Sequence, residues 1–325
     1  MKLANICALS VLAAGSASAQ GIFNASPNDD ITESLPLEYS VSVDLGWDDN
    51  VTPTLITERD DDVTYASAKL GANYVSRGPQ TNLDFNLGLG IIHYIDQPSA
   101  GSVDDSTYNA KFQFNVNHNV SEIIRLSTRN HIFYGLEPDY KYGVVNSRQN
   151  EEYLFFTTDN SIGYKWTERF ATYTGIKYDS LSYDGSDSRN DRDTLTLYNQ
   201  FRYVGSAQTV YTVDYRYGMT DVDGGRDSDN QKVLLGLEHR LSSTAILTAK
   251  AGAQFRKVDS RSDQTDPTFE LNYVQRVNEA FRVRVGAKYE INDYGTNIGS
   301  SSFENNQTLR VSVAGDYHLS PQVIL

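Results

Sequence analysis

Hydrophobic and polar positions alternate with a period of two along most of the chain after residue 39. The segment 281–291 is a clear case, because Phe281 and Val283 alternate with Arg282 and Arg284. Successive side chains of a β-strand point to opposite faces, so this period indicates strands with one apolar and one polar face. No helical period of 3.6 residues extends over a useful window. The sequence therefore predicts an all-β fold.

The alternation predicts about fourteen strands, most of them roughly 9–14 residues long, which is the length that a tilted membrane-spanning strand needs. Strands of soluble sandwiches are nearer 5–6 residues in length. The pattern therefore favours a transmembrane antiparallel β-barrel over a soluble sandwich or solenoid. The predicted strands lie at 40–47, 64–75, 81–91, 107–117, 123–134, 153–166, 170–180, 194–204, 209–218, 232–241, 245–257, 268–277, 281–291 and 307–317.

The connections between these strands alternate in length, as expected for an up-and-down barrel with one turn side and one loop side. With the N-terminus on the periplasmic side, the long loops face outward. Short turns are predicted near 77–80, 119–121, 167–169, 205–208, 242–244 and 278–279. Long acidic loops are predicted near 48–63, 95–106, 135–152, 184–193, 219–231, 258–267 and 295–306.

The N-terminus has the pattern of a cleaved export signal. Lys2 precedes an apolar core over 3–14, and Ala17-Ser18-Ala19 form a small-residue cleavage site,. We expect a signal peptide at 1–19, a periplasmic leader at 20–38 and the barrel at 39–325. The one cysteine lies within the signal, so the mature chain is expected to contain no disulfide,.

The end of the sequence predicts a further strand. His318 to Pro321 has the composition of a short turn, and Val323-Ile324-Leu325 has that of a strand which has only begun. Bacterial barrels have an even number of strands. We therefore expect the chain to be truncated at its C-terminus and the complete protein to have about sixteen strands.

Charge is distributed unevenly, although the formal net charge is −14. The strands carry more Lys and Arg than Asp and Glu, and the loops carry the acidic excess. Charged strand residues should face the lumen because lipid contact is costly for them, and basic pores favour anions. The pore-lining candidates are Arg125, Arg129, Lys165, Lys177, Arg202, Lys250, Arg256, Arg282, Arg284, Lys288 and Arg310. The same parity holds for Asp44, Asp84, Asp159, Glu238, Glu270, Glu290 and Asp316. Structural ion pairs across neighbouring strands are an equally good explanation.

Aromatic residues lie near many strand ends, where amphipathic rings of a membrane protein meet the headgroups. Their strand propensity is the alternative explanation. The predicted interfacial girdle comprises Tyr39, Trp47, Tyr65, Tyr74, Tyr94, Tyr134, Tyr153, Trp166, Phe170, Tyr183, Tyr203, Tyr217, Phe255 and Tyr294.

Catalytic and metal-binding motifs are not found. The sequence has no nucleophile-elbow, zinc-protease, Walker or Rossmann motif. Its histidines are His93, His118, His131, His239 and His318, and none can be assigned a serine partner. The Asp-rich loops lack EF-hand spacing, so solvated acidic loops are a better interpretation than Ca²⁺ sites. We predict no enzyme activity, cofactor, metal site or nucleic-acid partner.

The opening of the barrel resembles a known group. The stretch PLEYSVSVDLGWDDNV (36–51), with its Gly46–Val51 turn, is similar to the putative outer-membrane β-barrel porins of Gram-negative bacteria, some of which are linked to exopolysaccharide export. The resemblance implies an outer-membrane location and a possible role as a polysaccharide outlet. It supplies no catalytic residues.

The sequence therefore predicts a pore for passive diffusion or export of polar solutes or polysaccharide, with a mild anion preference. The alternative is a structural or adhesive barrel with a plugged lumen, whose acidic loops bind surface polysaccharide or divalent ions. Membrane lipid and lipopolysaccharide are expected partners in either case. Tyr140 and Tyr142, on the longest loop, would stack on sugar rings or pack within the mouth.

Overall fold

The computed structural model of the chain is an all-β structure. It describes residues 37–48, 63–95, 105–136, 152–184, 191–223, 226–259, 263–278, 280–292, 296–298, 301–303, 306–320 and 323–324. Its long strands are β1 (Leu37–Asp48), β2 (Val63–Arg77), β3 (Thr81–Tyr94), β4 (Ser106–Asn119), β5 (Ile124–Leu136), β6 (Glu152–Lys165), β7 (Phe170–Asp184), β8 (Arg192–Ser206), β9 (Thr209–Val222), β10 (Ser228–Arg240), β11 (Ala245–Val258), β12 (Gln264–Arg276), β13 (Phe281–Asn292) and β16 (Asn306–Ser320). The signal peptide and the greater part of the leader lie outside the described residues, and none of the described segments is a helix able to cross a membrane.

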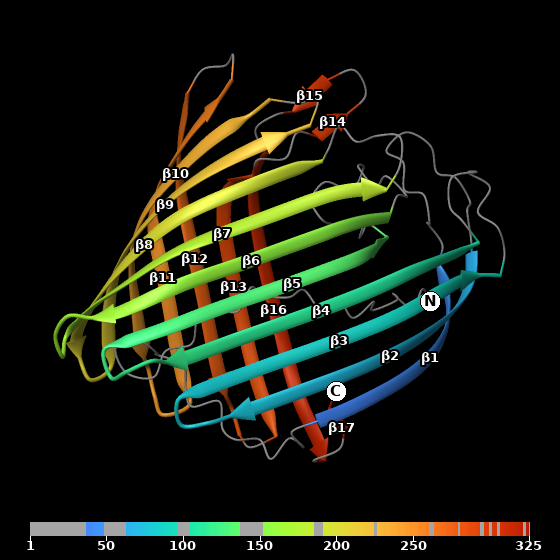
Figure 1. Cartoon of the computed structure of the whole chain (residues 1–325), viewed down its shortest axis with the longest axis horizontal. Helices are drawn as coiled ribbons and strands as arrows, with labels where there is room; N and C mark the ends of the chain where they lie inside the picture. Colours follow the sequence, from blue (N-terminus) through green and yellow to red (C-terminus); the bar gives the residue numbers. More distant parts are fainter. Residues whose placement is uncertain are drawn as a thin grey trace.

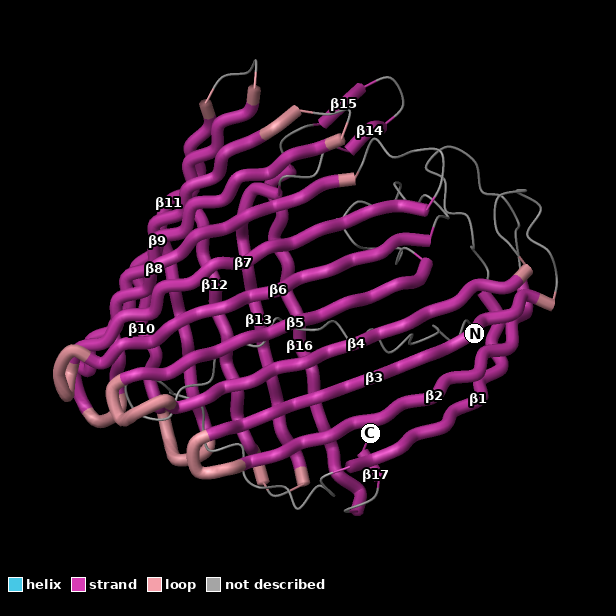
Figure 2. Tube along the Cα trace, viewed as in Figure 1, coloured by secondary structure: helices cyan, strands magenta, loops and turns pink. Residues whose placement is uncertain are grey.

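Each long strand pairs with the next one along the chain in antiparallel orientation. The sheet curls round so that β1 to β7 form one wall and β11 to β16 form the wall behind it (Figure 1). The short turns gather at one end of the barrel (Figure 2). The predicted all-β fold, an antiparallel up-and-down β-barrel, is confirmed (Figure 1).

The two ends of the sheet are β1 and the short strand β17 (Val323–Ile324), which pairs with β16. Within the described residues no ladder joins these ends. The outward side chains of both end regions are widely exposed, Val43 at 74% and Val313 at 73%. β17 agrees with the expected start of a further strand, whereas the predicted turn at 318–321 is wrong at its start because β16 continues to Ser320. The total of sixteen strands and the truncation stay predictions.

Several strands continue further toward the long loops than the sequence indicated. β9 ends at Val222 and β10 begins at Ser228. Likewise, β11 ends at Val258 and β12 begins at Gln264. The predicted loops at 219–231 and 258–267 are therefore partly strand. The extensions of β10 and β12, at 228–231 and 264–267, consist of polar residues and one proline, so they lack hydrophobic alternation, yet their backbones still pair. A two-stranded hairpin of β14 (Thr296–Ile298) and β15 (Ser301–Phe303) also lies within a predicted loop.

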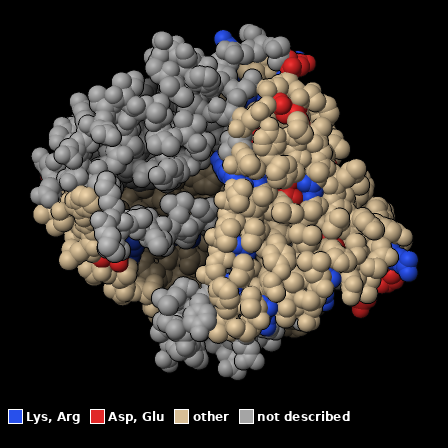
Figure 3. All heavy atoms as spheres, turned by 180° about the vertical axis from the view of Figure 1, so that it is seen from behind, with Lys and Arg blue, Asp and Glu red and all other residues tan. Residues whose placement is uncertain are grey.

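The cross-strand register gives the sheet an apolar outer face. Val233 of β10 lies between Tyr215 of β9 and Ala253 of β11, and all three point outward. Large apolar side chains on this face are exposed, including Leu235 at 65%. The outer surface of the back wall accordingly has few charged groups (Figure 3). Burying this face in hydrocarbon removes it from water, which is the main driving force for placing such a sheet in a bilayer.

The predicted aromatic girdle is wrong at four positions. Tyr65, Tyr94, Tyr153 and Tyr183 lie on the inner face, and the last three are only 7–8% exposed. Extending the parity of the charged positions would have separated them from outward rings, because Tyr153 shares the inward parity of Asp159 and Tyr183 that of Lys177. Trp47, Tyr74, Trp166, Tyr203 and Phe255 are exposed aromatic residues, as a girdle requires. Tyr294 lies outside the described residues.

A charge on the outer face tests the membrane placement. Replacing Leu235 with Arg at the middle of β10 should lower the free energy of unfolding in lipid vesicles by about 2–4 kcal/mol, because an arginine there contacts hydrocarbon. Urea titration followed by heat-modifiable gel mobility would measure it. Asn73→Arg, on the inner face of β2, is the control and should leave stability nearly unchanged. Equal stability of the two variants would contradict the assignment of faces.

Candidate functional site in the barrel interior

All eleven pore-lining candidates lie on the inner face of the sheet. Along each strand, the residues on either side of a candidate point outward, so the candidate itself points inward. Arg202 and Arg256 are buried, at 3% and 5% exposure, whereas Arg284 and Arg310 are exposed. The carboxylates predicted to face inward share this face, and the register sets Asp316 opposite Arg282. The interior is therefore a mixed, strongly charged surface.

The most buried of these charges form one bidentate ion pair. Arg202 of β8 donates from both terminal nitrogens to the two carboxylate oxygens of Glu238 on β10, each at 2.6 Å. The pair crosses β9 on the concave side of the sheet, where side chains of strands that are not adjacent converge. Both side chains are less than one tenth exposed. Two parallel charge-assisted hydrogen bonds of this kind fix geometry as well as charge.

A second group is centred on Asp214 of β9, which is 2% exposed. Lys250 of β11 donates to Asp214 at 2.6 Å, and Gln200 of β8 donates to its other oxygen at 2.5 Å. Lys250 crosses β10 over Gly236, where a Cβ would collide with the lysine side chain. Glycine is needed here because the long side chain occupies the space above the strand.

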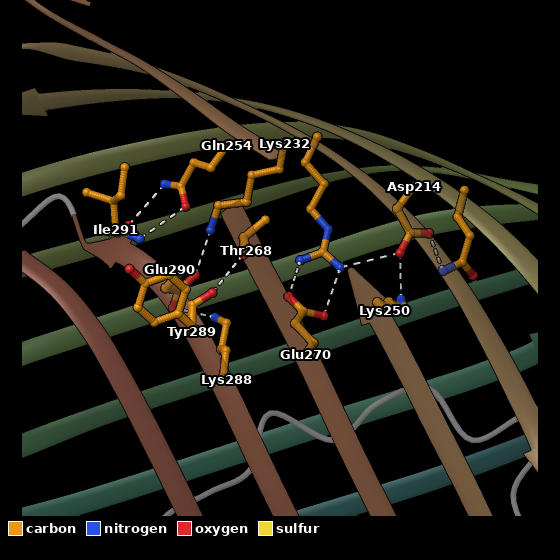
Figure 4. Close-up of polar contacts among 12 residues, drawn as sticks. Asp214, Lys232, Lys250, Gln254, Thr268, Glu270, Lys288, Tyr289, Glu290 and Ile291 are labelled. Carbon is orange, nitrogen blue, oxygen red and sulfur yellow. Dashed lines mark hydrogen bonds and ion pairs between the residues drawn. The ribbon is translucent and has the colours of Figure 1, made fainter. Parts of the chain in front are cut away.

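A third group extends across β9 to β13 (Figure 4). Arg216 of β9 donates to Glu270 of β12 at 3.0 Å. Glu290 of β13 accepts from Lys232 of β10 at 2.6 Å and lies 2.5 Å from Lys288 on its own strand. One carboxylate thus serves two ammonium groups.

These contacts show that structural ion pairing accounts for part of the charged interior. It holds for Lys177, Arg202, Lys250 and Lys288, which have carboxylate partners at 2.5–2.7 Å. Several members of the groups were missed from the sequence. Asp214, Arg216 and Lys232 have the same inward parity as the predicted residues, so extending the parity argument to every strand position would have found them. Their partners, two or three strands away, could not have been found in this way.

Apolar side chains cover part of the inner face near the long-loop ends of β2 to β7. Tyr153, Leu181 and Tyr183 are buried together, with Phe133 and Phe155 packed against them. Val63 and Tyr94 form a second cluster, with Tyr65 and Ile92. The interior is therefore charged on the β8–β13 side and largely aromatic at the loop end of the other wall.

A cavity of about 260 Å³ lies where these two regions meet, toward the long-loop ends of the strands. Its apolar lining includes Phe155, Leu181 and Ile291. Its charged lining comprises Lys177, Asp179, Arg192, Arg216, Lys232, Lys288 and Glu290. Basic groups therefore outnumber carboxylates around this space.

The expectation that no histidine has a serine partner is wrong at one position, because His93 Nδ1 of β3 lies 2.9 Å from Ser106 Oγ of β4. His118 and His239 face outward near short turns and contact Thr81 and Thr209, each at 2.8 Å. His131 faces inward against the ring of Phe155. Among the described residues there is no group of three acidic, histidine or cysteine side chains suited to a metal ion. The longest predicted loop, with Tyr140 and Tyr142, and most of the Asp-rich loops lie outside those residues.

Comparison with known proteins gives structural matches only. No protein-family model matches the chain, and no curated protein matches its sequence. The structure is similar to the COG4313 outer membrane channel from Pseudomonas putida F1, with a TM-score of 0.42, 13% identity, and coverage of 74% of this chain and 96% of that one. It is also similar to the P. putida toluene transporter TodX, with a TM-score of 0.38, 11% identity and coverage of 86% of each chain.

A mutant of the ferric enterobactin receptor PfeA from Pseudomonas aeruginosa is a further match, with a TM-score of 0.43 and 10% identity over 88% of this chain. The present chain spans about half the length of that receptor, 51%. At such identities and TM-scores, these matches do not indicate which solute, if any, the present chain transports.

The buried ion pair on β8 and β10 gives a stability prediction. Arg202→Met leaves Glu238 buried without its partner and should lower the free energy of unfolding by about 3–5 kcal/mol. Replacing both residues, with Glu238→Leu, should recover most of this loss because no unpaired charge remains. Urea titration of the single and double variants measures the coupling. Additive losses in the double variant would show that the two side chains do not act as a pair.

Proposed function

We propose that the chain forms an outer-membrane pore for polar solutes, with a preference for anions. The proposal rests on the difference in polarity between the two faces of the sheet. The outer face is apolar and widely exposed, whereas the inner face holds the charged groups and the cavity. A sheet with these faces is stable in a bilayer and offers water-soluble molecules a polar path through it.

The anion preference rests on the excess of basic groups inside. Carboxylates neutralise some of these groups, but Glu290 is shared by Lys232 and Lys288. Rings of basic side chains raise the local concentration of anions in a pore and repel cations. Polysaccharide export is a narrower form of the proposal, supported by the resemblance of the first strand and by the aromatic inner wall.

The alternative of a plugged, structural barrel also has support in the interior. The ion pairs from β8 to β13 span strands that are not adjacent, and Asp214 and Gln254 are almost fully buried. Side chains therefore fill the lumen along that wall. A barrel that folds but conducts no ions would favour this alternative over an open pore.

Planar-bilayer recording of the refolded protein under a salt gradient tests the proposal. Stable conductance steps with an anion-biased reversal potential are expected. Replacing Lys177 and Lys288 with Gln should move the reversal potential toward cations, because both side chains are more than 40% exposed to the interior. Lys257→Gln, on the outer face of β11, is the matched control and should change nothing. A cation-selective wild-type pore would contradict the anion preference.

A further inference from the structure

The cavity between the aromatic and charged regions has three features that together select a ligand. Its basic lining comes from β7, β8, β9, β10 and β13, so cationic groups surround the space from several directions. Its volume of about 260 Å³ lies just below the range of roughly 300–1,000 Å³ typical of sites for drug-sized ligands,. A compact anion is therefore a better fit than an extended one.

Asn230 adds a second requirement that is independent of charge. It lines the cavity from β10 and is only 9% exposed. Its Oδ1 atom accepts no hydrogen bond from the described residues. A buried acceptor without a donor is costly, so turning the Asn230 side chain to bring Oδ1 into the cavity, toward a hydroxyl hydrogen of a ligand, would relieve this cost,. Asn230 therefore favours a hydroxylated ligand over a bare inorganic anion.

Phe155 and Leu181 supply the third feature, an apolar side to the cavity. The Phe155 ring is held by edge contact with His131, at 6.0 Å between ring centroids. Leu181 is 3% exposed and belongs to the buried Tyr153–Tyr183 cluster. A ligand in the cavity would thus have carbon on one side and cationic nitrogen on the other. The C–H face of a sugar ring suits an aromatic surface of this kind.

From these features we infer that the cavity is a binding subsite for a sugar acid of monosaccharide size. The carboxylate is bound by the exposed ammonium groups of Lys177 and Lys288, which also contact Asp179 and Glu290. A hydroxyl group donates to Asn230 Oδ1 once that side chain turns into the cavity, and the carbon face of the ring packs on Phe155. The inference deepens the proposed function, on which it rests for a path by which solutes reach the interior. The acid could come from solution or from one residue of an acidic polysaccharide.

Isothermal titration calorimetry of the folded, detergent-solubilised protein tests the inference without requiring conductance. Sodium D-glucuronate should bind, and D-glucose and sodium sulfate should each bind at least about tenfold more weakly, because one lacks the charge and the other lacks hydroxyl groups and carbon. If glucose binds with the same affinity as glucuronate, the proposed role of the charge is overturned. Equal binding of sulfate would overturn the role of Asn230 and Phe155.

Two variants locate the site. Lys177→Gln should weaken glucuronate binding about tenfold, and Lys257→Gln on the outer face should leave it unchanged. Phe155→Leu removes the ring while keeping an apolar side chain, and it should also weaken binding if the ring contacts the ligand. Heat-modifiable mobility confirms that each variant is folded. Unchanged affinity in both cavity variants would overturn the inference.

A hyaluronan tetrasaccharide distinguishes the two sources of the acid. Tighter binding of the tetrasaccharide than of glucuronate supports a polysaccharide chain, and tighter binding of glucuronate supports a free sugar acid. Absence of binding by both overturns the inference. This result is separate from the proposed function, because a barrel that conducts anions but binds neither probe would keep the pore and lose the subsite.

Discussion

The pairing of every long strand with the next long strand of the chain is the constraint on which the rest of this structure depends. In hydrocarbon a backbone N–H or C=O group without a partner is costly, so a membrane-spanning sheet satisfies these groups between strands. Antiparallel neighbours joined by short turns do this with the shortest connections. Once the register is set, each side chain takes either the outer face or the interior, and a shift by one residue would exchange the two faces.

Curvature of the sheet gives the interior its particular chemistry. On the concave face, long side chains of strands that are not adjacent approach one another, as Arg202 and Glu238 do across β9. The ion pairs therefore link three or four strands rather than two. Each pair compensates part of the cost of taking its charges out of water. The same convergence brings Phe155 of β6 and Glu290 of β13 to one cavity, although they are far apart in the sequence.

The two parts of the interior suit different tasks. Buried pairs such as Arg202–Glu238 act within the wall and hold β8 to β10 together. The more exposed cations, among them Lys177 and Lys288, remain accessible to solvent. Structural charges and solvent-exposed charges therefore share the same inward parity in the sequence, and only their degree of burial in the structure distinguishes them.

The sequence by itself determined the fold class, the strand positions and the face of each charged strand residue, because all of these follow from a local period of two. It also indicated β17 as the start of a strand. Only the tertiary structure showed that Tyr153, Leu181 and Tyr183 are buried together, that β9 to β12 continue into predicted loops, and that Arg216 reaches Glu270. These features depend on backbone pairing without hydrophobic alternation and on curvature, which brings distant strands together. Neither leaves a periodic signal in one sequence.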